Sequence, residues 1–172
     1  PIGELSYLGL PLRENVPRSM RQGVEATIRW QISTRLSAEV NGAVSHNWIA
    51  AYTNDSIGTT YYDVPPLLTP AVSTNQQLTY AVRRGISLSL EGRFTSRSFL
   101  DNTENPSFVL PAAYITDARI AWQDAPGHLD VSLFVNNVAD VLRYSNGYTD
   151  GSVSYYYPLP PRNLYFQVRA AF

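Results

Sequence analysis

The chain has 172 residues, a net charge of −1 and a mean hydropathy of −0.18, with 16% charged and 12% aromatic residues. Its 13 basic residues are all arginines scattered along the sequence, so we expect no nucleic-acid partner. Cysteine is absent, which excludes disulfides and thiolate metal sites, and the longest apolar run, residues 48–52, is far too short for a membrane helix.

Alternation of apolar and polar residues, the pattern of a two-faced strand, recurs along most of the chain. Residues 1–20 are interpreted as an outer loop or, at residues 4–10, as a weak first strand. From residue 21 to the C-terminus the pattern predicts seven strands, so the total is seven or eight. The predicted strands are 24–32, 36–45, 71–83, 86–96, 113–123, 128–138 and 162–172.

The connections between these strands alternate in length. Short links at 33–35, 83–85 and 124–127 predict tight hairpins, and long links fall at about 51–70, 97–112 and 140–160. Bacterial outer-membrane barrels combine short periplasmic turns with long extracellular loops. Their strands need about 9–11 residues, whereas strands of soluble sheets average about 5–6. The sequence therefore predicts an all-β, antiparallel transmembrane β-barrel segment.

Nine charged residues inside the predicted strands fall on one face. This separation suits a wall with lipid on one side and water on the other, because arginine at the middle of a barrel's lipid face costs about 2–4 kcal/mol. A soluble sheet also separates its faces, but its strands would be shorter. The charged positions are Glu25, Arg29, Glu39, Glu91, Arg93, Asp117, Arg119, Asp130 and Arg169.

Four segments resemble the C-terminal β-barrel portion of TonB-dependent outer-membrane receptors. They are GVEATIRW at 23–30, LPAAYITDARIAW at 110–122, LDVSLFVNNVADVLRY at 129–144 and PPRNLYFQVRAAF at 160–172. The last two are the most specific, because they pair an Asn-Asn-x-x-Asp motif with a Pro-Arg motif and a terminal aromatic. The resemblance covers most of residues 23–172.

The resemblance implies that residues 1–172 form one partial barrel domain, with the plug and the other strands upstream of Pro1. The parent receptor would import a scarce nutrient, such as an iron–siderophore, across the outer membrane of a Gram-negative bacterium. Its partners would be outer-membrane lipid, an extracellular small molecule, the barrel assembly machinery and, through the N-terminal region, an inner-membrane energy-coupling protein. The assembly signal would be the last strand, with Phe166, Val168 and Phe172.

Binding is a better prediction than catalysis, because the long links are rich in aromatic residues and recognition is usually built on loops. Tyrosine offers a broad face and a hydroxyl group at small entropic cost. Tyrosines of an interfacial girdle would give the same pattern. The candidate ligand-binding residues are Tyr52, Tyr61, Tyr62, Phe99, Tyr148, Tyr155 and Tyr156.

No enzyme, metal site or cofactor is predicted. His46 and His128 are expected at opposite ends of the barrel, and no serine nucleophile motif accompanies His128. The lumenal carboxylates alternate with arginines, and we expect Glu91 to pair with Arg93, and Asp117 with Arg119. Two alternatives remain: a complete small eight-stranded outer-membrane barrel with a structural or adhesive role, and a barrel hydrolase that uses His128.

Overall fold

The computed structural model describes residues 2, 6, 8–10, 12–55, 57–124 and 127–171. This part of the chain is all-β, and it contains no helix long and apolar enough to cross a membrane. Its strands are β1 (Ser19–Gln31), β2 (Leu36–Asn54), β3 (Thr59–Val64), β4 (Val72–Arg83), β5 (Ile86–Thr95), β6 (Ser98–Phe99), β7 (Val109–Leu110), β8 (Ala113–Gln123), β9 (Leu129–Asn136), β10 (Tyr144–Asp150), β11 (Val153–Pro158) and β12 (Asn163–Ala170).

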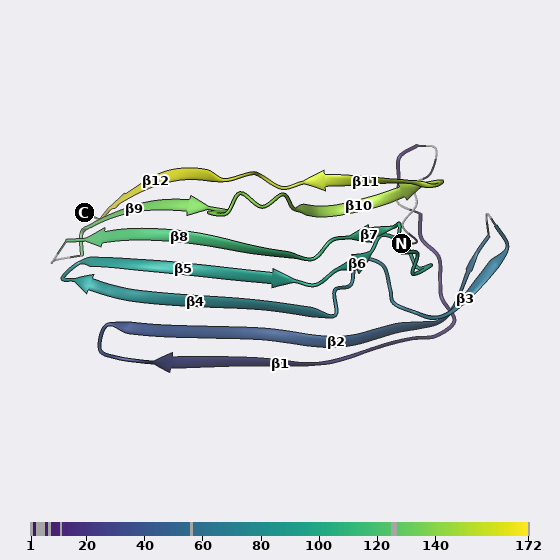
Figure 1. Cartoon of the computed structure of the whole chain (residues 1–172), viewed down its shortest axis with the longest axis horizontal. Helices are drawn as coiled ribbons and strands as arrows, with labels where there is room; N and C mark the ends of the chain where they lie inside the picture. The colour runs from purple at the N-terminus through teal and green to yellow at the C-terminus, as the bar shows by residue number, and fades with distance from the viewer. Residues whose placement is uncertain are drawn as a thin grey trace.

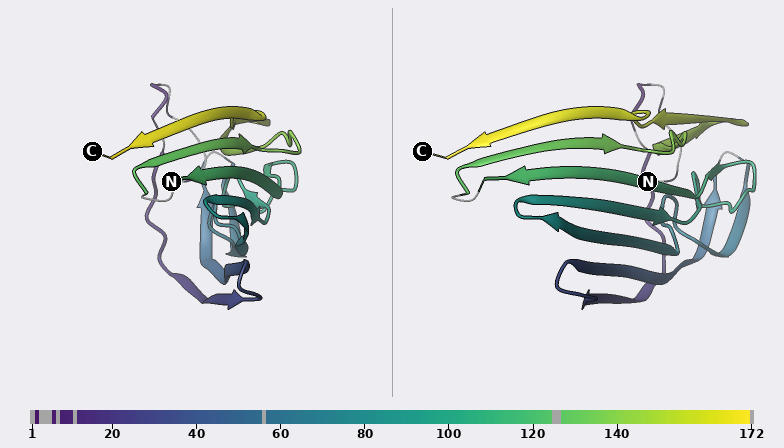
Figure 2. Two further views of the ribbon diagram at one scale, coloured as in Figure 1. Left: turned by 90° about the vertical axis from the view of Figure 1, so that its left-hand side faces the viewer. Right: turned by 60° about the vertical axis from the view of Figure 1, so that its left-hand side comes forward.

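Seven long strands form one antiparallel sheet in the order β1-β2-β4-β5-β8-β9-β12, and β3 pairs with the far end of β2. Figures 1 and 2 show these strands side by side in a single curved layer. We call the end with the tight hairpins the turn end and the opposite end the loop end. Within the described residues β1 and β12 do not pair with each other, so the sheet has two free edges.

The predicted all-β segment of antiparallel strands is confirmed, with seven strands in the wall. Strand β2 runs to Asn54, nine residues beyond its predicted end, because β1 and β3 both pair with its outer half. Short hairpins lie inside the long links, where sequences rich in proline and asparagine suggest loops only. Of the weak strand predicted at 4–10, residues 6 and 8–10 are not in a strand, and the others lie outside the described residues.

The register confirms that the two faces differ. Leu90 lies between Leu78 on β4 and Ala118 on β8, whereas the next residue, Glu91, lies between Gln77 and Asp117. Large apolar side chains of the first face are exposed, including Val24, Ile28, Leu90 and Phe166. An exposed apolar face of this extent is unusual in a soluble monomer and needs an apolar covering. We call it the apolar face and the other the polar face.

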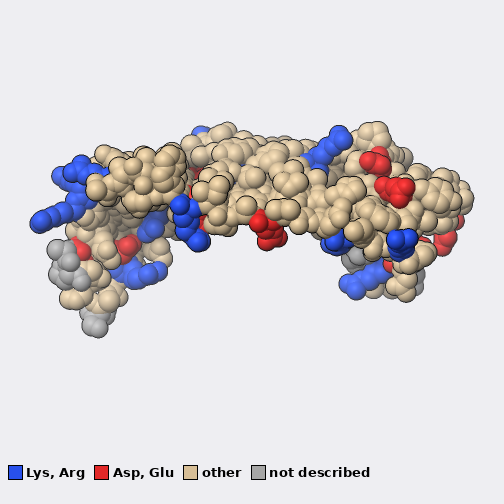
Figure 3. Space-filling model, turned by 90° about the horizontal axis from the view of Figure 1, so that it is seen from below, with Lys and Arg blue, Asp and Glu red and all other residues tan. Residues whose placement is uncertain are grey.

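Aromatic side chains lie on the apolar face near both ends of the wall. Trp30, Tyr80 and Trp122 are near the turn end, and Trp48 and Tyr114 are near the loop end. Tyr114 and Trp122 are about 27 Å apart along β8 at ~3.4 Å per residue. Figure 3 shows charged atoms at both ends of the molecule and a largely uncharged upper surface between them, with a basic and an acidic group at the lower edge of the middle part. This pattern matches an apolar band between two aromatic girdles.

The described part of the chain has little buried apolar core. Ile49, Tyr52 and Val64 form a cluster at the loop end, where β2 and β3 pair, and Val16 and Tyr61 pack against it. A second buried point is Leu100, which is fully buried between the long links. The packing that exists therefore orders the loop end, while the wall is held mainly by its backbone ladder.

Candidate functional site

The Asn-Asn-x-x-Asp motif joins the wall to the hairpin of β10 and β11. The side chain of Asn137 brackets Val141, because its amide donates to Val141 O and its carbonyl accepts from Val141 N, both at 2.9 Å. Asn137 is 1% exposed and has a φ of 52°. Asparagine tolerates this left-handed conformation better than most residues. The motif therefore turns the chain out of β9 at a fixed angle.

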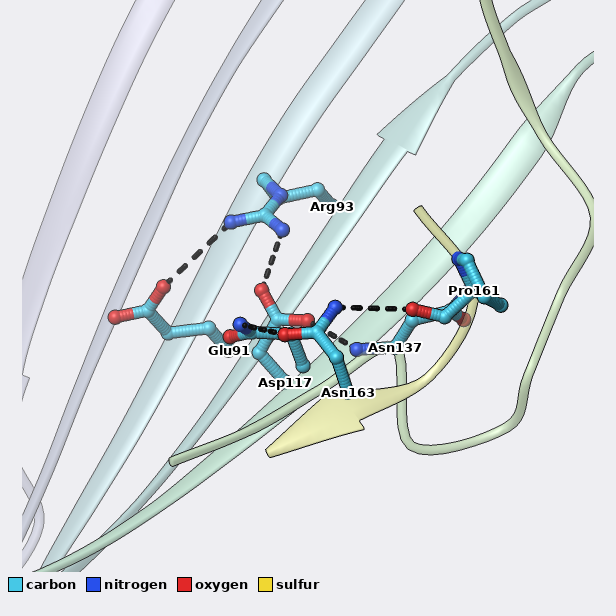
Figure 4. Close-up of polar contacts among 7 residues, drawn as sticks. Glu91, Arg93, Asp117, Asn137, Pro161 and Asn163 are labelled. Atoms are coloured by element: carbon cyan, nitrogen blue, oxygen red, sulfur yellow. Dashed lines mark hydrogen bonds and ion pairs between the residues drawn. The ribbon is translucent and has the colours of Figure 1, made fainter. Parts of the chain in front are cut away.

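The Pro-Arg motif returns the hairpin to the wall beside this turn. Arg162 N donates to the Asp140 carboxylate at 2.8 Å, and the Asn136 amide donates to the Asn163 side chain at 2.9 Å. Asn163 in turn donates to Pro161 O at 3.0 Å. The two motifs that carry the sequence resemblance are thus bonded to each other. They hold both ends of the hairpin together, as Figure 4 shows for Asn163 and Pro161.

An ion network on the polar face supports this junction. Arg93 donates to the Asp117 carboxylate and lies 3.8 Å from Glu91, and Asp117 also accepts from Asn137 N at 2.7 Å (Figure 4). The predicted pairing of Glu91 with Arg93 is confirmed, but the pairing of Asp117 with Arg119 is wrong. Asp117 bonds across the strands to Arg93 on β5, whereas Arg119 bonds to residues of β9 on its other side.

Arg119 instead joins β8 to β9. Its guanidinium donates to Ser132 Oγ at 2.8 Å and lies 3.8 Å from Asp130 and 5.1 Å from the ring centre of Phe134. Phe134 stacks on Tyr165 of β12, with 4.3 Å between ring centres. Alternation places both rings on the polar face, but their packing together could be found only from the register of β9 and β12.

The hairpin carries three tyrosines on one face, which we call the tyrosine face: Tyr148, Tyr155 and Tyr157. Tyr148 is directly opposite Tyr155, and their rings stack with centres 5.0 Å apart and planes 10° apart. The centre of Tyr157 lies 6.0 Å from that of Tyr148. Tyr155 and Tyr157 are 43% and 52% exposed, so the face is open to a partner.

The opposite face of the hairpin packs against the link between β5 and β8. Gly147 lies against Leu100, where an added Cβ would come within 2.9 Å of the leucine side chain. The Tyr156 hydroxyl donates to Val109 O at 3.0 Å, and Ser154 Oγ donates to Ser107 O at 3.3 Å. The tyrosine face is therefore presented by a hairpin that is fixed from behind.

The same link also fixes the segment that follows β3. Leu67 N donates to the side chain of Asn102 at 2.9 Å, and Leu68 N donates to Phe99 O at 2.8 Å. Asn102 is almost fully buried. Residues 97–110 thus contact both neighbouring links and hold the loop end together as one unit.

Partial burial raises the pKa of the Tyr148 phenol, and the neighbouring Tyr157, Tyr155 and Asp150 raise it further. A phenol with a raised pKa stays protonated at neutral pH and keeps its hydroxyl donor. The tyrosine face is therefore an uncharged surface that combines stacking area with hydrogen-bond donors.

The seven predicted ligand-binding residues fall into different environments. Tyr148 and Tyr155 belong to the tyrosine face, and Tyr62 is 70% exposed on β3. The others take part in packing: Tyr52 is 2% exposed and stacks with Tyr61, Phe99 lies under Arg97, and Tyr156 is bonded to the neighbouring link. Tyr157 completes the tyrosine face, and its spacing of two from Tyr155 is the signal that places it there.

The remaining predicted features occupy the wall. His46 on β2 and His128 before β9 lie toward opposite ends of the sheet, as predicted. Across the described ranges, no three histidine or acidic side chains gather as a metal site. Phe166 and Val168 of the predicted assembly signal are exposed on the apolar face of β12, whereas Phe172 lies outside the described residues.

The fold is closely similar to that of solved outer-membrane receptors. The unliganded ferric citrate transporter FecA matches with a TM-score of 0.73 and 22% identity, over 88% of this chain and 24% of FecA. The chain has the fold of part of a TonB-dependent receptor barrel. The ferric yersiniabactin uptake receptor FyuA from Yersinia pestis matches with a TM-score of 0.70 and 19% identity, over 90% of this chain and 24% of FyuA.

The siderophore receptor PiuA from Acinetobacter baumannii matches with a TM-score of 0.69 and 14% identity, over 88% of this chain and 22% of PiuA. The chain thus spans about a quarter of the length of these structures. No family model and no curated protein matches the sequence.

Proposed function

We propose that this chain forms part of the wall and the outer loops of an outer-membrane receptor that imports a scarce nutrient, such as an iron–siderophore, by TonB-dependent active transport. The observation that carries the proposal is the likeness in fold to receptors and transporters of ferric chelates. The separation of charged and apolar faces supports a membrane location, with the turn end at the periplasm and the loop end outside.

The tyrosine face is the part of this chain that we propose for ligand contact. It is uncharged, exposed, rigidly supported and located at the loop end. Stacked phenols suit ligands with flat or partly apolar surfaces, because an aromatic contact adds about 0.5–1.5 kcal/mol beyond the area that it buries. Tyr62 is a further exposed candidate on the hairpin of β2 and β3.

We further propose that residues 1–172 are one part of a barrel domain whose other strands and plug belong to the same full protein. The two free edges support this, because an unpaired edge within lipid leaves backbone groups without hydrogen bonds. Phe166, Val168 and Phe172 would form the assembly signal, and an inner-membrane protein would supply energy through the plug. A complete eight-stranded barrel is less well supported, because β1 and β12 do not pair within the described residues.

Growth on defined ferric chelates tests the proposal. Cells that lack the full-length protein should fail to use one chelate from a panel of ferric citrate, ferric yersiniabactin and ferric enterobactin under iron limitation. The wild-type gene should restore growth only while the energy-coupling protein is present. Uptake of every chelate by the deletion strain at wild-type rates, with other receptors also deleted, would contradict iron import. Copper would then be the next cargo to test, because the copper transporter OprC has a similar fold.

A further inference from the structure

Three arginines occupy two adjoining turns at the turn end of the sheet. Arg35 lies between β1 and β2, and Arg83 and Arg84 lie where β4 turns into β5. Strands β2 and β4 are neighbours, and Ala81 N donates to Arg35 O at 2.7 Å, so the two turns are side by side. All three side chains are exposed, and none takes part in the ion pairs found among the described residues.

No acidic residue on these two turns balances the arginines. The nearest acidic turn joins β8 to β9, where Asp124 accepts a hydrogen bond from Leu129 N at 2.8 Å and is partly buried. Its carboxylate therefore already has a partner in its own turn. Figure 3 shows both basic and acidic atoms at this end of the molecule. The two turns form a small basic patch with no acidic residue of its own, which we call the turn patch: Arg35, Arg83 and Arg84.

The level of the turn patch relative to the membrane follows from the aromatic residues beside it. Trp30 and Trp122 each lie one residue before the end of their strand, and Tyr80 lies near the end of β4, all on the apolar face. Tryptophan and tyrosine of a barrel lie at the level of the lipid headgroups. The turn patch lies immediately beyond them, which is the depth of the lipid phosphates.

We propose that Arg35, Arg83 and Arg84 bind the phosphate groups of anionic phospholipids in the membrane leaflet at the turn end. Guanidinium groups bind phosphate oxygens in a two-pronged geometry, and juxtamembrane basic residues are attracted to anionic leaflets. Adjoining turns place three such groups against one leaflet. The inference rests on the proposed membrane location but is separate from transport, and it adds a lipid-binding site to the wall.

The test measures lipid binding to the purified full-length protein by native mass spectrometry. The added lipid is phosphatidylglycerol or phosphatidylethanolamine. The wild-type protein should retain phosphatidylglycerol preferentially. The triple variant Arg35→Gln/Arg83→Gln/Arg84→Gln should lose about tenfold or more of its phosphatidylglycerol affinity, because each basic residue near an anionic surface contributes roughly a fivefold factor. Added salt should weaken wild-type binding, since exposed charges are screened.

Two further variants make the result specific. Arg35→Lys/Arg83→Lys/Arg84→Lys keeps the charge and should keep most of the preference for phosphatidylglycerol. That result would also show that substitutions at these turns leave the barrel folded. Arg13→Gln/Arg97→Gln/Arg162→Gln removes the same charge from exposed positions in the outer links and should bind phosphatidylglycerol like wild type. Equal losses in both glutamine variants would overturn the proposal, since net charge alone would explain them.

Unchanged phosphatidylglycerol affinity in the turn-patch glutamine variant would also overturn the lipid-binding proposal. An acidic protein surface would then be the better partner for the turn patch. The measurement needs no transported ligand. A failed test of iron import would therefore leave its outcome intact.

Discussion

Single polar residues fix the geometry of the loop end. Asn137 combines a positive φ with two hydrogen bonds to Val141, and Asp117 and Asp140 receive backbone N–H groups of the same junction. Asn137 is buried, and buried polar groups are costly to leave without partners, about 1–3 kcal/mol each. The Asn-Asn-x-x-Asp spacing is thus explained by turn geometry rather than by catalysis.

Replacing Asn137 by alanine should destabilise the barrel. Asn137→Ala removes both bonds to Val141 and places alanine in a left-handed conformation, so the free energy of unfolding should fall by about 1–3 kcal/mol. Asn137→Gly loses the same hydrogen bonds but tolerates the positive φ, and it should be less damaging. Denaturant unfolding of the full-length protein measures both. Wild-type stability in the alanine variant would show that the junction is not stabilising.

A second prediction at the scale of single residues concerns the tyrosine face. Tyr155→Leu removes a stacked ring and a hydroxyl from the exposed side of the hairpin, so affinity for a chelate that the full-length protein is found to take up should fall about two- to tenfold. Tyr80→Leu makes the same chemical change on the apolar face near the turn end, and it should leave affinity unchanged. Equilibrium binding to whole cells measures both. Equal affinities for Tyr155→Leu and wild type would exclude Tyr155 from the ligand site.

At the scale of elements, the link between β5 and β8 organises the loop end. Leu100 is fully buried against the hairpin of β10 and β11, and Asn102 bonds to Leu67 on the other side. A separate buried cluster, Ile49, Tyr52 and Val64, lies where β2 and β3 pair. One packed side chain therefore connects two outer segments.

Truncation of Leu100 should loosen these segments together. Leu100→Ala should cost about 2–5 kcal/mol locally and increase protease cleavage within both 97–112 and 140–160. Leu142→Ala is the matched control, because Leu142 is 70% exposed and its truncation should change little. Limited proteolysis of the full-length protein in detergent gives the comparison. Cleavage confined to 97–112 would show that the two segments are not coupled.

The sequence predicts the wall better than the loop end, for a physical reason. Wall strands such as β8 have strict alternation, and the predicted range 113–123 is the observed strand. The hairpins β2–β3, β6–β7 and β10–β11 depend on contacts between links, such as that of Leu100 with Gly147. The local sequence pattern does not encode these contacts. The tyrosine face was only partly predicted for the same reason, since composition suggested tyrosines but only the register of β10 and β11 places Tyr148 opposite Tyr155.

At the scale of the whole molecule, the two faces of the sheet have opposite chemistry along the length of the wall. Ion pairs such as Arg29 with Glu39 and Arg93 with Asp117 link neighbouring strands on the polar face. The apolar face presents leucine, isoleucine, valine and aromatic side chains between two aromatic girdles. Lipid on one side and water on the other is the arrangement in which both faces are satisfied.

The most direct test of this account is a spin-label scan along β5. The chain has no cysteine, so positions 86–95 of the full-length protein can be labelled one at a time once any cysteines elsewhere are replaced. In outer membranes, labels at even positions such as 88 and 90 should be most accessible to oxygen, and labels at odd positions such as 89 and 91 to a water-soluble nickel reagent. A nickel reagent that reaches both sets equally, with no period of two, would contradict a lipid-facing wall.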